Sequence, residues 1–433
     1  METVLVLVLE SLLLATIPAC ASELFGARML RVVPESHDQL DHLHFMLVNS
    51  PFDFWREPRE VGMPVDIMVT LSELPELIHT LTSQGLTAEE IIKDVGQMVV
   101  ERSLAVYARG PRAMDWEDFH DYTTITKWLT SLSKDYPNLC TLEEVGKSYE
   151  GRPMKLFMVG KGGADNPGIF IDGGSHGREW IAPATVTYMI NKLVTNSTEY
   201  DDLLSQVNFY FMPVINPDGY DFTFINPNNR FWRKTRSDYR PKVPEESEEP
   251  EELEENPVCI GVDANRNWGH HWMEGGASNN SCRFTYAGPE PFSEVENRVV
   301  RDQILRLRSK LKMYLSFHSY GQQFMYPWGY THVYPDDWKE LDDIARKAVS
   351  ALTAVYGTNY TIGTTNNIFR RALAGGSHDW VKSVANVKLS YTVELGNSGN
   401  LFCPNSSDII PSGEETFQAL LVLADHVKET YAH

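Results

Sequence analysis

The chain has 433 residues and a formal net charge of −21, from 38 Lys and Arg residues against 59 Asp and Glu residues. A surface this acidic repels nucleic acid and anionic membranes, so we expect neither as a partner. The hydrophobic content of 42% is enough for large packed cores, and the length predicts two or three domains.

The N-terminus has the pattern of a secretory signal. The run Val4–Ile17 is apolar, and Ala19-Cys20-Ala21 is a small-x-small cleavage site. We therefore expect a signal peptide over residues 1–21 and a secreted, extracellular protein. No later stretch has 18 uncharged apolar residues, so no membrane span is expected. Four glycosylation sequons fit the same route, at Asn196, Asn279, Asn359 and Asn405.

Between Glu23 and Arg112 the hydrophobic patterning predicts a small separate α/β unit. Its expected strands are Ala27–Val33 and Val65–Val69, and its expected helices are Leu40–Leu47, Leu74–Gln84 and Thr87–Ser103. The unit ends at a Gly-Pro step flanked by Arg109 and Arg112, which is typical of a linker open to trypsin-type cleavage. A linker that is never cut is the alternative.

From about Ala113 onward, strand-like runs alternate with helical patterns, which predicts one large α/β domain. The expected strands are Leu156–Val159, Gly168–Asp172, Val207–Ile215, Lys312–Phe317 and Val387–Val393. The expected helices are Thr185–Leu193, Glu294–Leu311, Trp338–Val355 and Glu414–Tyr431. This order implies a central mixed, mostly parallel sheet with helices on both faces, where ligands bind beyond the carboxyl ends of strands.

Charge and cysteine patterns mark two further features. The segment Glu245–Glu255 reads EESEEPEELEE, which is typical of a solvated loop. An acidic rim that attracts basic substrates is the alternative. Cys259 and Cys282 could close a loop in an oxidising compartment, whereas Cys140 and Cys403 read as buried free thiols.

Polar side chains follow several of the expected strands. His176 and Glu179 have H-x-x-E spacing just after one strand, His318 ends a second and Glu394 ends a third. Two imidazoles and a carboxylate can hold Zn²⁺ and leave a fourth position for water, as catalytic zinc sites do. An H-x-x-E alone is weak, so its value here lies in the residues that accompany it.

Two arginine-bearing clusters lie between those points. Arg233 stands in FWRKTRS, and Asp263, Asn265 and Arg266 stand in VDANRNW. Most arginines in polar loops are surface charge. An Arg beside an Asn near a strand end can also bind a carboxylate through its fork of donors.

These motifs together give the chain its resemblance to a known family. HGREW, NPDGY, FWRKTRS, VDANRNW, HSY, GGSxDW and TVEL occur in that order. In this combination the chain resembles the precursor of an A/B-type zinc metallocarboxypeptidase, from the signal to the last helix. The resemblance implies an inhibitory propeptide over residues 22–112 and a catalytic domain over residues 113–433.

The resemblance also implies an activity and partners. It implies a secreted, monomeric enzyme with one zinc ion that hydrolyses the C-terminal bond of peptides and proteins. It further implies that a trypsin-like protease removes the propeptide by cleavage near Arg112. Cys259 and Cys282 fall where the family has a disulfide.

The metal and the base follow from matching positions in the family motifs. His176, Glu179 and His318 resemble the zinc ligands. Asp263 resembles the carboxylate that orients the first histidine. Glu394 resembles the general base, which takes a proton from the zinc-bound water and later delivers one to the leaving amine.

Substrate contacts follow in the same way. Arg233 resembles the cation that steadies the oxyanion of the tetrahedral intermediate. Asn265 and Arg266 resemble the clamp on the terminal carboxylate, which restricts such enzymes to chain ends. The remaining expected substrate contacts are Arg178, Ser319, Tyr320 and His378.

Two positions depart from the family pattern. The loop before GGSxDW lacks the usual tyrosine, so that either Phe369 or Arg371 takes its place. The variable position of GGSxDW, which shapes the pocket for the terminal side chain, is His378. We expect aromatic or aliphatic ends first and acidic ends second, because a neutral imidazole stacks on rings and a protonated one attracts Asp or Glu.

Other functions remain open from the sequence. A non-catalytic zinc-binding or peptide-binding homologue would fit the missing tyrosine, but would not need Glu394 as a base. Another zinc amidohydrolase is the third alternative, and the Asn265/Arg266 pair favours a substrate with a free terminal carboxylate instead.

Overall fold

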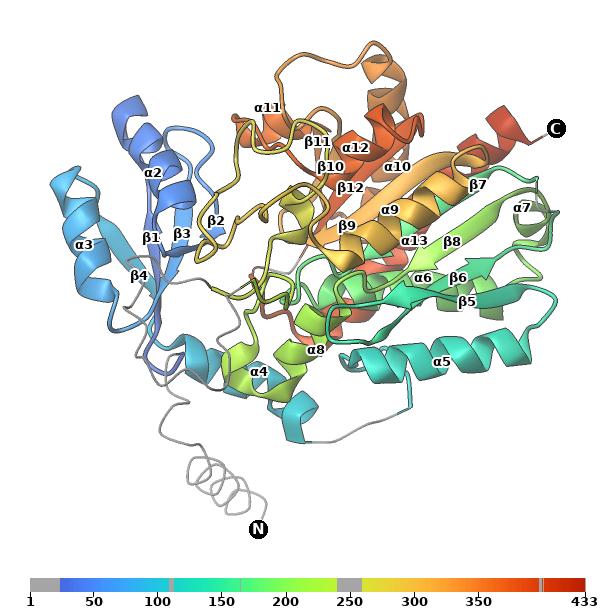
Figure 1. The fold of residues 1–433 in the computed structure, drawn as a ribbon, viewed down its shortest axis with the longest axis horizontal. Helices are drawn as coiled ribbons and strands as arrows, with labels where there is room; N and C mark the ends of the chain where they lie inside the picture. The colour runs from blue at the N-terminus through green and yellow to red at the C-terminus, as the bar shows by residue number, and fades with distance from the viewer. Residues whose placement is uncertain are drawn as a thin grey trace, which may run out of the picture.

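The computed structural model describes residues 24–108, 113–163, 165–239, 259–396, 399 and 401–432. The expected signal peptide, the Arg112 cleavage site and the acidic run Glu245–Glu255 lie outside these residues. The described chain forms a small N-terminal unit and a large α/β domain that lie side by side (Figure 1). Among the described residues, no helix has the length and hydropathy that crossing a membrane requires.

The N-terminal unit is a four-stranded antiparallel sheet with helices. Its elements are β1 (Arg28–Val32), α2 (His37–Asn49), β2 (Asp53–Arg56), β3 (Val65–Val69), α3 (Leu74–Ser83), β4 (Ala88–Ile92) and α4 (Val95–Ala108). The strand order is β2-β3-β1-β4. One face packs against α2 and α3 through apolar residues such as Leu43, Leu77 and Ile67. The Ser36 hydroxyl caps α2 by accepting from the Gln39 amide.

One expectation for this unit is wrong. The segment Thr87–Ser103 was expected as a single helix, but residues Ala88–Ile92 form β4 and the helix α4 begins only at Val95. The strand pairs along β1 at the sheet edge, and its Glu89 and Glu90 side chains are exposed. Tertiary pairing therefore overrides the helical preference of this glutamate-containing run.

The large domain alternates strands and helices as expected. Its first half contains α5 (Tyr122–Asp135), β5 (Cys140–Lys147), β6 (Pro153–Val159), β7 (Gly168–Gly173), α6 (Ile181–Thr195), α7 (Asp201–Gln206), β8 (Asn208–Met212) and α8 (Pro217–Ile225). Its second half contains α9 (Val295–Leu307), β9 (Leu311–Ser319), β10 (Gln323–Tyr326), α10 (Trp338–Tyr356), β11 (Thr361–Thr364), α11 (Thr365–Phe369), α12 (Ser377–Ser383), β12 (Leu389–Leu395) and α13 (Ile409–Tyr431). Short 3-10 turns are η1 (Pro227–Asn229), η2 (Ala264–Arg266) and η3 (Ser406–Asp408).

The eight-stranded sheet is mixed, with a parallel centre. Its order is β11-β10-β12-β9-β7-β8-β6-β5, and β12, β9, β7 and β8 are parallel to one another. Alternating side chains serve two cores: Ile169 and Ile171 pack with α6, α10 and α13, whereas Phe170 packs with α9 and α12. The helices on both faces are visible in Figure 1. The carboxyl ends of these central strands position the site.

The two units meet through an apolar cluster beside the cleft. Met29, Trp55 and Val99 of the N-terminal unit pack with Phe231 and Phe402 of the large domain. The Trp55 ring centroid lies 4.5 Å from that of Phe231. The face of the small sheet opposite α2 and α3 is therefore buried against the large domain.

Candidate active site

The first two candidate ligands lie in the turn between β7 and α6. Gly174 has a φ of +63°, a conformation that favours glycine, and it turns the chain away from the strand. A Cβ on Gly177 would collide with the Gly219 carbonyl oxygen, so the turn also needs glycine for close backbone approach. His176 and Glu179 are both nearly fully buried at this position.

His176, Glu179 and His318 converge on one point. Their candidate ligand atoms all lie within 4.8 Å of one another. The Nδ1 atoms of His176 and His318 are 3.3 Å apart, and they lie 2.6 Å and 3.1 Å from the two Glu179 carboxylate oxygens. Burial acts to raise the pKa of Glu179, but the two imidazoles lower it, so the carboxylate is ionised. Two nitrogens and one carboxylate in this arrangement fit a zinc ion.

The opposite nitrogen of each imidazole is also engaged. His176 Nε2 lies 3.0 Å from Asp263 Oδ1, and His318 Nε2 lies 3.2 Å from Ser316 Oγ. The Ser316 hydroxyl donates in turn to the buried Asp172 carboxylate at 2.7 Å. Such partners fix the ring orientation and the tautomer of metal-binding histidines.

Asp263 links the candidate metal site to Arg233. Arg233 donates to Asp263 Oδ2 from Nη2 at 2.8 Å and from Nε at 3.2 Å, while the Asn265 amide donates to Oδ1. Burial acts to raise the pKa of Asp263, but Arg233 and His176 hold it well below its usual range. The pair keeps the Arg233 guanidinium at the mouth of the site, where Nη1 is 3.8 Å from Glu179 Oε1.

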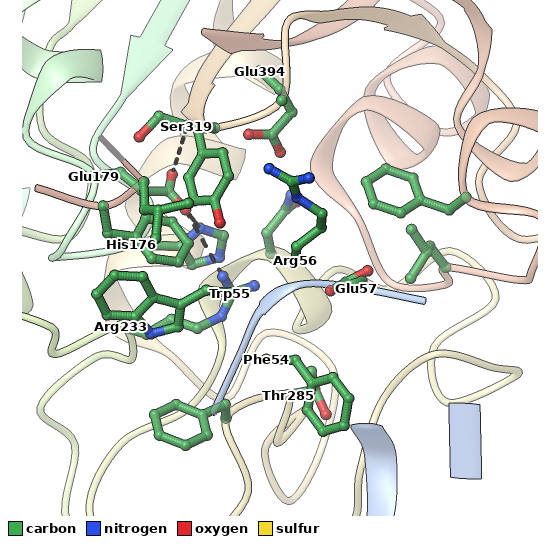
Figure 2. A pocket seen from close by; sticks show the side chains of 18 of the residues that line it. Phe54, Trp55, Arg56, Glu57, His176, Glu179, Arg233, Thr285, Ser319 and Glu394 are labelled. Carbon is green, nitrogen blue, oxygen red and sulfur yellow. Dashed lines mark hydrogen bonds and ion pairs between the residues drawn. The ribbon is translucent and has the colours of Figure 1, made fainter. Parts of the chain in front are cut away.

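Glu394 reaches the site from the neighbouring strand. It pairs in register with His318 across the parallel strands β12 and β9. Burial raises the pKa of the Glu394 carboxyl to about 7, against the charge of His318. In Figure 2 the Glu394 carboxylate points toward the cleft that Glu179, His176 and Arg233 line.

Two hydrogen-bonded loops form the next part of the cleft. Arg266 donates from Nε to the Gly276 carbonyl oxygen at 2.9 Å, which fixes its side chain. Asn265 Oδ1 accepts from the Ser377 amide at 3.0 Å, and Trp268 N donates to the Gly375 carbonyl oxygen at 3.0 Å. The loop around Asn265 and the GGSHDW loop are thus held together.

Beside these loops the cleft is lined by His378 together with the apolar side chains of Met325, Phe369 and Leu373. His378 Nε2 lies 2.9 Å from the Thr365 hydroxyl, and its Nδ1 is buried without a partner among the described residues. Burial lowers the pKa of His378 to about 3, so the imidazole is neutral. Phe369 packs with Met325 and Leu373 at the same pocket.

Residues Asp53 to Arg59 of the N-terminal unit occupy the cleft. The family resemblance implies an inhibitory propeptide over the cleft, but the sequence singles out none of these residues. Asp53 Oδ2 accepts from Arg178 Nη1 at 2.6 Å, and Glu57 Oε2 accepts from Arg371 Nη2 at 2.6 Å. Figure 2 shows Trp55 and Glu57 among the site residues. Arg59 lies over the Phe369 ring at 4.6 Å. The only sequence signal was the charged string DFWREPRE, which has no periodicity to interpret.

The other expected residues have these positions. Ser319 and Tyr320 follow His318 at the end of β9 and line the cleft. The Ser319 amide donates to Glu179 Oε2 at 3.3 Å, and the Tyr320 ring packs against Phe402. Cys259 and Cys282 form a disulfide, as expected, and Cys140 and Cys403 are buried free thiols.

Comparison with known proteins agrees with the geometry. A buried site of two imidazoles and a carboxylate at the carboxyl end of a sheet fits a catalytic metal centre. Residues 125–419 match the family described as zinc carboxypeptidase, and residues 30–102 match the carboxypeptidase activation peptide. The chain therefore belongs to the zinc carboxypeptidase family, as a metallocarboxypeptidase precursor with an activation peptide.

Individual relatives extend the match over most of the chain. A carboxypeptidase B of Astacus astacus is 56% identical over 321 residues, which are 74% of this chain and all of the relative. Zinc carboxypeptidase A 1 of Anopheles gambiae is 37% identical over 92% of this chain and 89% of the relative. The crystal structure of carboxypeptidase A from Helicoverpa armigera superposes with a TM-score of 0.84, at 27% identity over 94% of this chain and 99% of that one.

Proposed function

We propose that the processed protein is a secreted zinc carboxypeptidase that releases aromatic or aliphatic residues from peptide C-termini. The observation that carries this proposal is the convergence of His176, Glu179 and His318 beside Glu394 in one buried cleft. These three side chains would hold a single zinc ion. When bound, zinc supplies a Lewis acid and lowers the pKa of a coordinated water to about 7.

Glu394 is proposed as the general base. Its carboxyl is buried next to the site, and its pKa of about 7 suits proton transfer near neutral pH. It takes a proton from the attacking water and returns one to the nitrogen of the departing amino acid. No serine or cysteine nucleophile is needed for this route.

Arg233 and the Asn265/Arg266 loop are proposed to bind the substrate. The Arg233 guanidinium, held by Asp263, is positioned to steady the oxygen that becomes negative as the peptide carbonyl is attacked. Asn265 and Arg266 bind the terminal carboxylate, which places only the last peptide bond at the site. Arg178, Ser319 and Tyr320 provide further contacts along the cleft.

The side-chain preference is inferred from the pocket around His378. The pocket includes Met325, Phe369 and Leu373, and the His378 imidazole is neutral. A neutral ring favours aromatic and aliphatic side chains over carboxylates, because it offers no charge to an acidic group. The free Nδ1 of His378 can accept or donate one hydrogen bond inside this pocket.

The precursor is proposed to be activated by a trypsin-like protease near Arg112, with the domain limits 1–21, 22–112 and 113–433. Asp53 to Arg59 would leave the cleft with the activation peptide. The Cys259–Cys282 disulfide supports an oxidising, extracellular setting. A monomer is proposed, which sedimentation of the processed protein would test.

The decisive experiment uses the full-length precursor, treated with trypsin and assayed on peptides ending in Phe, Leu, Glu or Lys. We expect chelator-sensitive release of Phe and Leu, slower release of Glu and little release of Lys. Glu394→Gln should abolish release while the protein keeps its zinc. The control Glu340→Gln alters only an exposed pair with Lys388 and should behave as wild type. Rapid release of Lys would contradict the proposed preference.

A further inference from the structure

Arg371 stands in the loop just before the GGSHDW motif, and its guanidinium contacts a carboxylate. Glu57 Oε2 of the activation peptide lies 2.6 Å from Arg371 Nη2. The Arg371 side chain is only 12% exposed, and that of Glu57 is 21% exposed. The contact joins residues separated by 314 positions, so it forms only when the activation peptide is docked.

The loops place Arg371 next to the residues proposed to bind the terminal carboxylate. Ala374 N donates to the Gly275 carbonyl oxygen at 3.0 Å, which joins the Arg371 loop to the one that follows Arg266. A Cβ on Gly276 would lie 3.0 Å from Arg371 Nη1, and the Gly276 carbonyl oxygen accepts from Arg266 Nε. The two guanidinium groups thus flank the same short stretch of backbone.

Glu57 places an anionic group beside Arg371 in the precursor. It lines the same cleft as Arg233, Asn265 and Arg266. Burial acts to raise the pKa of Glu57, but the charges of Arg371 and Arg266 lower it to about 2, so the group is fully ionised.

Removal of the activation peptide leaves a charge to be balanced. Burial lowers the pKa of Arg266, and the nearby Arg233 and Arg371 charges lower it further, whereas Asp263 and Glu57 oppose this. Without Glu57, the positive charges of Arg266 and Arg371 still repel each other, and one of the carboxylates that neutralised them is gone. A partly buried cluster of this kind attracts an anion strongly.

We propose that Arg371 binds the terminal carboxylate of the substrate in the processed enzyme, at the position that Glu57 holds in the precursor. This inference rests on the proposed function and deepens it, since it adds a residue to the carboxylate-binding set. The guanidinium of Arg371 offers a charged fork of donors, which gives a strong hydrogen bond to a carboxylate.

Kinetics of the trypsin-treated precursor test the proposal. For a peptide ending in Leu, Arg371→Gln should raise KM on the order of 10- to 100-fold with kcat changed less than threefold, the effect of losing one charge-assisted hydrogen bond. Arg370→Gln is the matched control, because Arg370 pairs with Glu60 on the exposed surface. Glu57→Gln should leave KM of the processed enzyme unchanged. An Arg371→Gln enzyme with the KM of the control would overturn the proposal.

Binding measurements separate this inference from the proposed chemistry. In the Glu394→Gln background, calorimetry compares a peptide ending in Leu with its C-terminal amide. We expect the free acid to bind more tightly than the amide. Arg371→Gln should reduce this ratio of affinities on the order of 10- to 100-fold. The result does not depend on whether the wild-type enzyme hydrolyses peptides. Arg371→Lys, which keeps the charge without the fork, should lose less. If Arg371→Gln weakens the binding only of peptides that end in Glu, Arg371 contacts the side chain of the terminal residue, and the proposal is overturned.

Discussion

Asp53 of the activation peptide and Arg178 of the catalytic domain form a buried ion pair, with Oδ2 and Nη1 2.6 Å apart and each side chain only 3% exposed. The Arg178 guanidinium also lies over the Phe402 ring at 3.9 Å. Because both charges have been removed from water, each depends on the other for compensation. The docking of the activation peptide therefore depends on this pair more than on exposed ion pairs.

Replacing Asp53 with alanine should weaken that docking by on the order of 3–5 kcal/mol, since Arg178 would stay buried without its counter-ion. We expect the uncleaved Asp53→Ala precursor to hydrolyse a short peptide at least tenfold faster than the wild-type precursor. The control Glu90→Gln removes the exposed pair with Arg28 and should change this rate less than twofold. An Asp53→Ala precursor as silent as wild type would exclude this role.

Asp263 is expected to support zinc binding through His176. Asp263→Asn should lower zinc affinity about 10- to 100-fold, because the amide no longer provides a charged acceptor for the imidazole. It also removes the charge that holds Arg233. Zinc retention against a competing chelator measures the effect. Asp302→Asn, at an exposed surface pair, is the control, and equal retention by the two variants would argue against the expected role.

The strands and helices that the sequence predicted well are those with continuous apolar patterns. The run Gly168–Asp172 was expected as a strand and forms β7, whose residues are all buried. The edge strand β5 (Cys140–Lys147) was missed because its side chains are largely polar or exposed. The hydrophobic period of a sequence reflects which side chains are buried. A strand whose side chains are mostly exposed therefore gives little signal.

The candidate site and an inhibitory propeptide over it were predictable from the family motifs, but the propeptide residues that enter the cleft were not. The motifs name His176, Glu179 and His318 directly, and the structure brings them together. Nothing in the sequence around Asp53 or Glu57 indicates their partners, which lie 125 and 314 residues away. Such contacts depend on how two separately folded units dock, and local composition does not encode docking.

The Cys259–Cys282 disulfide is expected to stabilise the loop that leads to Asp263 and Asn265. It closes a segment with a sequence separation of 23, so its loss should lower the free energy of unfolding by about 3 kcal/mol. Thermal unfolding of a Cys259→Ser/Cys282→Ser variant measures this. A reducing agent should lower the melting temperature of the wild type toward that of the variant and leave the variant unchanged. A melting temperature equal to the wild type would contradict the expected contribution.

A buried carboxyl away from the cleft should make stability depend on pH. Glu296 in α9 is 1% exposed; its Oε1 accepts from the Tyr149 amide at 2.8 Å, and its Oε2 has no partner among the described residues. Burial raises its pKa from 4.5 to about 7, and the nearby Glu294 and Asp218 act in the same direction. Protons are therefore held more tightly in the folded state than in the unfolded state.

The sign of this effect follows from the direction of the shift. The neutral carboxyl stabilises the fold fully below pH 4.5, and this contribution is lost as the pH rises through about 7, by an amount on the order of 3 kcal/mol. Glu296→Gln stays neutral and keeps an acceptor for Tyr149. We expect its melting temperature relative to the wild type to rise by a few degrees between pH 5 and pH 8. If the difference between the two melting temperatures is the same at both values, the Glu296 carboxyl is ionised in the fold throughout.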